Sequence, residues 1–284
     1  MKLCRFQADG IICVGSLAPD GTVVDLGPES TVSVAAILNS VDPVSQVKSL
    51  TAAATRTHSL GDVTILSPID RQEVWAAGVT YLRSKTARME ESDFSATAYD
   101  RVYDAPRPEI FFKALAEKVV ATGDGVGIRK DGKWNVPEPE LALVINAGGK
   151  IVGCTIGNDM SSRDIEGENL LYLPQAKVYS RSCSLGPVIV LGASEAEVRS
   201  WEISISIVRE GSTVFSGTTS VSQIKRGLDE LAGYLFRSQE FPHGAVLLTG
   251  TGVVPPDDFT LAEHDRVDIE ISGIGRLSNP VVRV

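Results

Sequence analysis

Short runs of β-forming residues recur along the chain between turn signals, and this pattern limits the possible folds more than any other feature. From residue 73 onward the runs include VWAAGV, EIFF, ELALVI, KIVGCTIG, GPVIVL, EISISIV, GAVLLTG and RVDIEISGIG. Helical patterns are fewer, and we expect them near residues 80–92, 161–169 and 222–238. Many strands with few helices favour a β-rich α+β fold over an alternating βαβ sheet.

The N-terminal part of the chain has hairpin character of its own. Asp9-Gly10 and Asp20-Gly21 each lie between short β-rich runs, and Asp-Gly is typical of tight hairpin turns. A helical or mixed stretch follows, and then a strand that runs into a proline. We therefore predict a small N-terminal β-rich domain at residues 1–65 and a larger domain at residues 66–284.

Composition excludes several classes of protein. The formal net charge of −9 argues against binding to the phosphate backbone of nucleic acid, which favours basic patches. No apolar run approaches the roughly 18 residues of a membrane helix, and the N-terminus lacks the apolar segment of a signal peptide. The four cysteines show no CxxC spacing and are typical of reduced thiols. We expect a soluble cytoplasmic protein that binds neither nucleic acid nor membrane.

Two glutamates stand in an otherwise apolar, strand-like run, VPEPELALVI. They are Glu138 and Glu140, and residues two apart on a strand point to the same face. Two like charges this close repel each other, and burying either one alone is costly. A divalent cation coordinated by both carboxylates would remove the repulsion.

A third carboxylate can join this pair. Asn146-Ala147-Gly148-Gly149 is a good hairpin turn, and an even-length loop there would place Asp159 on the same face as the two glutamates. An odd-length loop would turn Asp159 away unless the strand bends. Three carboxylates at a strand end suit an open Mg²⁺ or Mn²⁺ site. The alternative is that the glutamates form a solvated polar stripe on a half-exposed strand.

Several ordered motifs carry a family resemblance. PEPELALVIN, GCTIGNDMSSRDIEG, LPQAKVYSRSCSLGPVIV, LLTGTGVVPP and IGRLSNPV resemble the fumarylacetoacetate hydrolase family from about residue 76 to the C-terminus. The resemblance implies a catalytic domain built as a mixed β-sandwich roll, after a small leading domain. It also implies a Mg²⁺ or Mn²⁺ ion at the mouth of the roll and a homodimer or homotetramer.

The resemblance assigns roles residue by residue. It implies that Glu138, Glu140 and Asp159 are metal ligands. The lysine of QAKVY, Lys177, becomes an acid–base or electrostatic residue, and the threonine of TGT, Thr251, a contact for the acid group of the substrate. Gln175 lies two residues before the lysine and is a further candidate for substrate binding.

The segment GVTYLRSKTARMEES departs from the family's hydrolases. They carry a water-activating histidine on a lid, whereas Ser84 stands roughly at that place here and the segment contains no histidine. The chain is more similar to the family's 2-keto-3-deoxy sugar-acid dehydratases, in which a glutamate matching Glu109 also lies at the metal site. Arg83 and Ser84, on the expected lid, are candidates for binding the substrate carboxylate or hydroxyls.

These assignments predict an enzyme whose substrate is a small 2-keto acid. We expect a divalent-metal-dependent dehydratase that converts 2-keto-3-deoxypentonate to 2,5-dioxopentanoate, with Lys177 as the base. Glu109 is either a further metal ligand or the residue that assists departure of the C4 hydroxyl. An acylpyruvate hydrolase or oxaloacetate decarboxylase on the same scaffold is the alternative. A relative that binds metal or acid without turnover is a third possibility.

Overall fold

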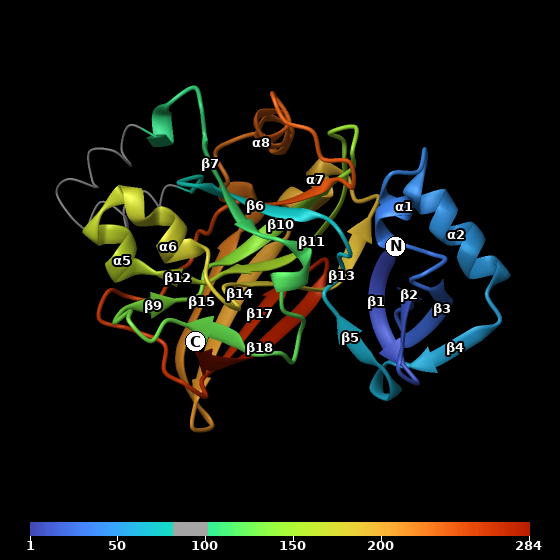
Figure 1. The fold of residues 1–284 in the computed structure, drawn as a ribbon, viewed down its shortest axis with the longest axis horizontal. Coiled ribbons are helices and arrows are strands. Elements are labelled where there is room, and N and C mark those ends of the chain that lie inside the picture. Colours follow the sequence, from blue (N-terminus) through green and yellow to red (C-terminus); the bar gives the residue numbers. More distant parts are fainter. Residues whose placement is uncertain (82–101) are drawn as a thin grey trace.

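The computed structural model describes residues 1–81 and 102–284, and most of the helix expected at 80–92 lies outside them. Within the described ranges the chain forms a large 11-stranded sheet, a 5-stranded sheet and a small 2-stranded one. The large sheet runs in the order β4-β3-β2-β1-β13-β11-β10-β16-β6-β7, with β5 paired to β1. Figure 1 shows the N-terminal strands and helices on one side of the molecule and the remaining elements on the other.

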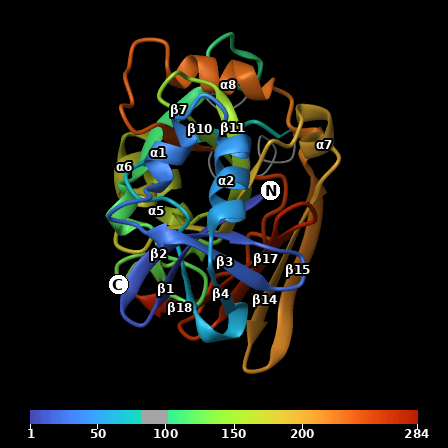
Figure 2. The ribbon, with the colours of Figure 1, turned by 90° about the vertical axis from the view of Figure 1, so that its right-hand side faces the viewer.

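The N-terminal part is a meander of strands with two helices against it. Its elements are β1 (Lys2–Ala8), β2 (Ile11–Leu17), β3 (Thr22–Pro28), α1 (Val34–Leu38), α2 (Pro43–Ala53), β4 (Arg56–Ser59), the 3₁₀ turn η1 (Leu60–Asp62) and β5 (Thr64–Leu66). Asp9 and Gly10 both have positive φ, 51° and 77°, as the predicted hairpin turn between β1 and β2 requires. Helix α2 begins after Asp42, whose carboxylate accepts from the amide of Ser45 at 3.1 Å. Figure 2 shows α1 and α2 beside these strands.

The rest of the large sheet carries the residues of interest. Its strands are β6 (Glu73–Gly78), β7 (Glu109–Ala114), β10 (Pro139–Ile145), β11 (Ile151–Asp159), β13 (Cys183–Leu191) and β16 (Ala245–Leu248). Strand β10 lies between β11 and β16, antiparallel to both, and β16 runs parallel to β6. Every residue of β10 is buried. This central position places the glutamate-bearing strand in the interior of the protein.

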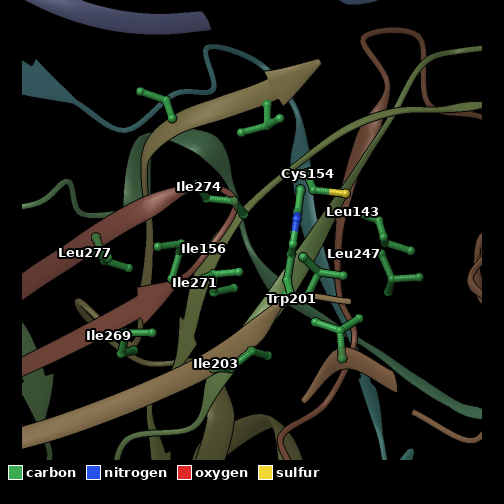
Figure 3. Packing of buried hydrophobic residues seen from close by; sticks show 14 of the residues in the cluster. Leu143, Cys154, Ile156, Trp201, Ile203, Leu247, Ile269, Ile271, Ile274 and Leu277 are labelled. Carbon is green, nitrogen blue, oxygen red and sulfur yellow. The ribbon is translucent and has the colours of Figure 1, made fainter. Parts of the chain in front are cut away.

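The 5-stranded sheet packs against one face of the large one. It contains β15 (Ser212–Ser220), β14 (Glu202–Arg209), β17 (Arg266–Ile271), β18 (Gly275–Arg283) and β8 (Val126–Ile128). Leu143 and Ile156 from the large sheet and Ile203, Ile269 and Leu277 from the second sheet belong to one hydrophobic cluster (Figure 3). Burial of this apolar surface between two sheets is the main source of stability for such a layered fold.

Short elements complete the chain around the ends of the central strands. They are η2 (Ala116–Lys118), β9 (Asn135–Val136), β12 (Ser161–Ser162), α5 (Arg163–Glu168), η3 (Leu170–Tyr172), α6 (Leu173–Lys177), α7 (Glu195–Arg199), η4 (Val221–Gln223) and α8 (Leu228–Leu235). Ile224 bridges to Tyr81, and the amide of Lys225 donates to the carbonyl of Thr80 at 3.1 Å. The guanidinium of Arg226 donates to the carbonyl of Ala105 at 2.6 Å. Residues 224–226 therefore hold the chain at 80–81 and again at 105.

The architecture confirms the predicted β-rich α+β fold, with a β-sheet region at the N-terminus. The helices expected near 161–169 and 222–238 are present as α5 and α8. The division at residue 65 stays a prediction, although β1 pairs with β13 and so joins the N-terminal strands to the large sheet. Among the described residues, no helix combines the length and the apolar character that crossing a membrane demands.

Candidate active site

Three carboxylates converge at one end of β10 and β11. Glu138 precedes β10, Glu140 lies on it, and Asp159 ends β11; each offers an oxygen within 4.8 Å of the others'. All three residues are at least 97% buried. The alternative, in which the glutamates form a solvated stripe, is therefore wrong, because Glu138 and Glu140 are 3% and 1% exposed.

The register of β10 and β11 explains why Asp159 joins the glutamates. Their hairpin loop spans residues 146–150, which is an odd length and would by itself turn Asp159 away. A register shift corrects this, since Ile145 pairs with Ile151 but Val144 pairs with Gly153, which leaves Val152 as a bulge residue. Beyond the bulge, Glu140 pairs with Gly157, and the amide of Asp159 donates to the carbonyl of Glu138 at 3.0 Å.

Buried cations surround the three carboxylates. The ammonium of Lys177, at the end of α6, lies 2.8 Å from Glu138 Oε2 and 3.3 Å from Asp159 Oδ2. Arg163 Nη2 lies 2.9 Å from Glu138 Oε1, and Lys113 on β7 pairs with Asp159 Oδ1. Both lysines are 0% exposed. Such buried charges are tolerated when each is paired and hydrogen-bonded.

Glu140 is the carboxylate least compensated by these cations. Burial raises its pKa well above the ordinary value of 4.5, and the nearby charges of Asp159 and Glu138 raise it further. The amide of Gly250, which donates to Glu140 Oε2 at 2.6 Å, opposes the shift. An additional positive charge close to Glu140 would favour its ionised form.

The donor set fits a hard divalent ion. All three groups supply carboxylate oxygen, the donor type that Mg²⁺ and Mn²⁺ prefer over nitrogen or sulfur. A small cavity reaches the cluster and is lined by Gly78, Phe111 and Thr251 as well as the three acids. Glu138, Glu140 and Asp159 are thus the residues that could hold the ion.

The other predicted site residues lie at different distances from this cluster. Thr251 lines the cavity, is 4% exposed, and donates from its hydroxyl to the carbonyl of Val253 at 3.0 Å. Gln175 is exposed on α6, and its carbonyl accepts from Arg129 at 3.0 Å. The structure does not bring Gln175 to the carboxylates. Gln175 and Lys177 are two positions apart on α6, and side chains two positions apart on a helix point to opposite sides.

Glu109 begins β7 and lies beside the cavity. It pairs across the ladder with Gly78, and a Cβ atom added at Gly78 would collide with the Glu109 carboxylate. Glycine at position 78 therefore allows this carboxylate to fold over β6 towards the cavity that Gly78 lines. Arg83 and Ser84 lie outside the described residues.

Sequence reasoning missed two of the buried cations. Lys113 follows Glu109 by four positions on the same strand, but it is the residue that the register shift leaves unpaired, since Val74 pairs with Ala114 and Trp75 with Phe112. Arg163, which follows Asp159 by four positions, reaches Glu138. Asp164 accepts from the Ser162 hydroxyl at 3.0 Å and the Lys133 amide at 2.7 Å.

Comparison with known proteins identifies the family. The sequence model described as "Fumarylacetoacetate (FAA) hydrolase C-terminal" matches residues 73–282. The chain belongs to the fumarylacetoacetate hydrolase family. Membership confirms the resemblance carried by the five motifs and accounts for a buried acidic cluster at one end of the family's β-rich domain.

Within this family the chain is similar to sugar-acid dehydratases. It is 51% identical over 217 residues to a probable 2-keto-3-deoxyxylonate dehydratase of Haloferax volcanii, covering 76% of this chain and 74% of the relative. It is 43% identical over 229 residues to the 2-dehydro-3-deoxy-D-arabinonate dehydratase of Saccharolobus solfataricus, covering 80% and 77%. A structure of 2-keto-3-deoxy-D-arabinonate dehydratase complexed with magnesium and 2,5-dioxopentanoate superposes with a TM-score of 0.83 at 35% identity, covering 100% and 99%.

Proposed function

We propose that the protein is a magnesium-dependent hydro-lyase that dehydrates 2-keto-3-deoxypentonates to 2,5-dioxopentanoate. The observation that carries the proposal is the buried triad of Glu138, Glu140 and Asp159 with Lys177 in direct contact with two of its members. The similarity to dehydratases at 51% and 43% identity supports the substrate class. The related structure with magnesium and 2,5-dioxopentanoate supports both the ion and the product.

The three carboxylates would hold Mg²⁺, with Mn²⁺ as an alternative ion. When bound, the ion supplies Lewis-acid chemistry, polarising the 2-keto group so that the C3 protons become acidic. The chain's own contribution begins with charge. Three anions and three buried cations, Lys113, Arg163 and Lys177, offset one another, so a bound divalent ion leaves the site positive and suited to an anionic 2-keto acid.

Lys177 is the proposed base at C3 of the substrate. Its ammonium is held among Glu138, Asp159 and the hydroxyl of Ser161, which it meets at 2.5 Å. The Phe111 ring lies 5.8 Å away and closes off one side. A lysine so enclosed keeps a fixed position, which proton transfer from a bound substrate requires. The ammonium first passes one proton to a neighbouring carboxylate or to water, and the neutral amine then takes one C3 proton from the substrate.

Glu109 is the proposed acid for the leaving group. As the C3 proton departs, the C4–O bond breaks and the hydroxyl leaves as water after gaining a proton from Glu109. This gives an α,β-unsaturated 2-keto acid that still carries the C5 hydroxyl. Transfer of one C5 proton to C3 then gives the C4–C5 enol, and transfer of the enol's hydroxyl proton to C4 gives 2,5-dioxopentanoate, with no external nucleophile. Thr251, which lines the cavity, is the proposed contact for the substrate's acid group, and Arg83 and Ser84 are further proposed contacts.

The proposal also covers the cellular location and the oligomeric state of the protein. A cytoplasmic location is supported by the four cysteines, all of which are buried and unpaired with one another. Assembly as a homodimer or homotetramer is supported by the family resemblance. Exposed apolar side chains such as Leu171, at 84% exposure, and Ile11, at 50%, are compatible with such contacts.

Nuclear magnetic resonance of product formation tests the proposed function. Purified protein is incubated with each C4 epimer of 2-keto-3-deoxypentonate, with Mg²⁺ or with EDTA. We expect the aldehyde proton of 2,5-dioxopentanoate to appear with Mg²⁺ from at least one epimer and to be absent with EDTA. Absence of the aldehyde from both epimers, in protein that binds Mg²⁺, would contradict the proposal. Release of pyruvate from acetylpyruvate or oxaloacetate would instead favour the hydrolase or decarboxylase alternative.

A further inference from the structure

Lys113 connects two parts of the site that are far apart in the sequence. The residue is 0% exposed, and its ammonium pairs with Asp159 Oδ1. The same group donates to the main-chain carbonyls of Met160 at 3.0 Å and Lys177 at 2.5 Å. Two main-chain hydrogen bonds and one ion pair therefore engage the ammonium, so its contacts are all with the protein's own groups.

The groups that Lys113 contacts are the main chain of the proposed base, Lys177, and the Asp159 carboxylate beside its ammonium. At one end, Lys113 takes Oδ1 of Asp159, while Oδ2 lies 3.3 Å from the Lys177 ammonium. At the other end, it binds the carbonyl of Lys177, which also accepts from the Ser182 hydroxyl at 2.9 Å. Lys113 thus restrains both the main chain of Lys177 and the carboxylate that its side chain contacts.

We propose that Lys113 is a positioning residue for the reaction, which holds the Asp159 carboxylate and the Lys177 main chain in fixed relative positions. The inference rests on the proposed function, because it assigns Lys177 as the base. A merely structural role for Lys113, neutralising a buried carboxylate, predicts lower stability but normal turnover by the folded fraction. A positioning role predicts slower turnover by folded protein, because small displacements of a reacting group are costly.

A groove beside Lys113 allows these two roles to be separated. This surface groove has a volume of about 550 Å³ and is lined by Lys113, Glu117, Lys118, Tyr179, Arg181 and Ser182. In Lys113→Ala, the space of the missing side chain would open into this groove. The lost atoms, three carbons and a nitrogen, match n-propylammonium, which could enter and restore the two donated hydrogen bonds and the ion pair with Asp159.

The experiment measures turnover and thermal stability of Lys113→Ala with n-propylammonium or, as a control of equal ionic strength, tetramethylammonium. We expect kcat of the variant to be about 100-fold below that of the wild type, and n-propylammonium to raise it about tenfold. The amine should also raise the Tm of the metal-free variant, because it binds the folded state. Tetramethylammonium, which has no N–H donor, should do neither. Wild type and Lys118→Ala, an exposed lysine of the same groove, should not respond.

Three results would overturn the inference. They are a kcat for Lys113→Ala within about threefold of wild type, a rise in Tm with n-propylammonium without a rise in kcat, and no response of either quantity. If Lys113→Ala does not fold, Lys113→Met keeps the apolar stem without the ammonium and must show the same loss of kcat. If the wild type dehydrates no 2-keto-3-deoxy acid, the proposed function fails. Mg²⁺-dependent exchange of the C3 protons of 2-oxobutyrate in heavy water then replaces kcat as the readout.

Discussion

Lys177 and Glu138 form a buried ion pair, with Nζ 2.8 Å from Oε2, although 39 positions separate them in the chain. The glutamate directly precedes β10, and the lysine ends α6. Because the same ammonium reaches Asp159 Oδ2 at 3.3 Å, it is positioned by two of the three acids that could hold the metal. The proposed base and the proposed metal ligands therefore form one continuous polar network.

Lys177→Met should abolish most of the dehydratase activity. The variant keeps the apolar stem but has no amine to take the C3 proton, so we expect kcat/KM to fall by about 10³-fold. Product formation followed by nuclear magnetic resonance gives the rate, and circular dichroism checks the fold. Lys133→Met, at an exposed position, is the matched control. Activity of Lys177→Met near that of the control would exclude Lys177 as the base.

Glu138→Gln should destabilise the metal-free protein, whereas Glu140→Gln should not. Glu138 is paired with Arg163 and Lys177, so its neutralisation leaves buried cations uncompensated and should lower the free energy of unfolding by about 3 kcal/mol. Glu140 is repelled by its two acidic neighbours, so its neutralisation should leave stability unchanged or increase it. Urea denaturation in EDTA measures both, and equal losses would contradict the charge assignment.

The same substitutions should both weaken magnesium binding. Each removes one anionic ligand from a cluster of three, and divalent ions favour charged oxygen donors. Isothermal titration with Mg²⁺ should show at least a tenfold increase in Kd, about 1.4 kcal/mol, for each variant. Glu263→Gln, an exposed acidic position, should bind as the wild type does. A wild-type Kd in Glu140→Gln would remove that residue from the ligand set.

The stability of the metal-free protein should depend on pH through Glu140. Its pKa in the folded state is raised above the ordinary 4.5, so above pH 4.5 the folded state retains a proton that the unfolded state releases. This contribution to stability is therefore greatest at low pH and is lost as pH rises towards the raised pKa. Thermal unfolding in EDTA across this range should show a slope that Glu140→Gln reduces. An identical slope in the two proteins would contradict the raised pKa.

Thr155→Val should stabilise the protein slightly. Thr155 is 0% exposed on β11, and its hydroxyl finds no hydrogen-bond partner within residues 1–81 and 102–284. Replacing an unsatisfied buried hydroxyl by a methyl group of similar shape should raise the free energy of unfolding by about 1 kcal/mol. Chemical denaturation measures the change, with Thr213→Val, at an exposed strand position, as control. A loss of stability in Thr155→Val would indicate that the hydroxyl has a partner such as a buried water.

Sequence reasoning succeeded where the chemistry is local to a strand. The period of two predicted Glu138 and Glu140 on one face, and the hairpin signal at 146–149 predicted that β10 and β11 pair. The even loop length that was to bring Asp159 to the glutamates is wrong, because the loop spans residues 146–150. The bulge at Val152 that restores the register was not predictable, because it depends on how β11 packs between β10 and β13. Lys113 was not predictable for a similar reason, because it lies at a register shift between β6 and β7. Arg163 was not predictable either, since its pairing with Glu138 depends on the three-dimensional path of α5.

The pairing of β1 with β13 has a practical consequence for anyone preparing shortened versions of this enzyme. Leu3 of β1 shares a hydrophobic cluster with Leu185, Ile189 and Leu248 of the large sheet, and Leu3 pairs directly with Ile189. A fragment starting at residue 73, where the family match begins, would leave the edge of β13 unpaired at Ile189 and Val190 and expose apolar surface there. The same strand begins at Cys183, which pairs with Asp159. Removing residues 1–72 would therefore destabilise β13 and, through it, the end of β11 that carries Asp159, although none of those residues belongs to the carboxylate cluster.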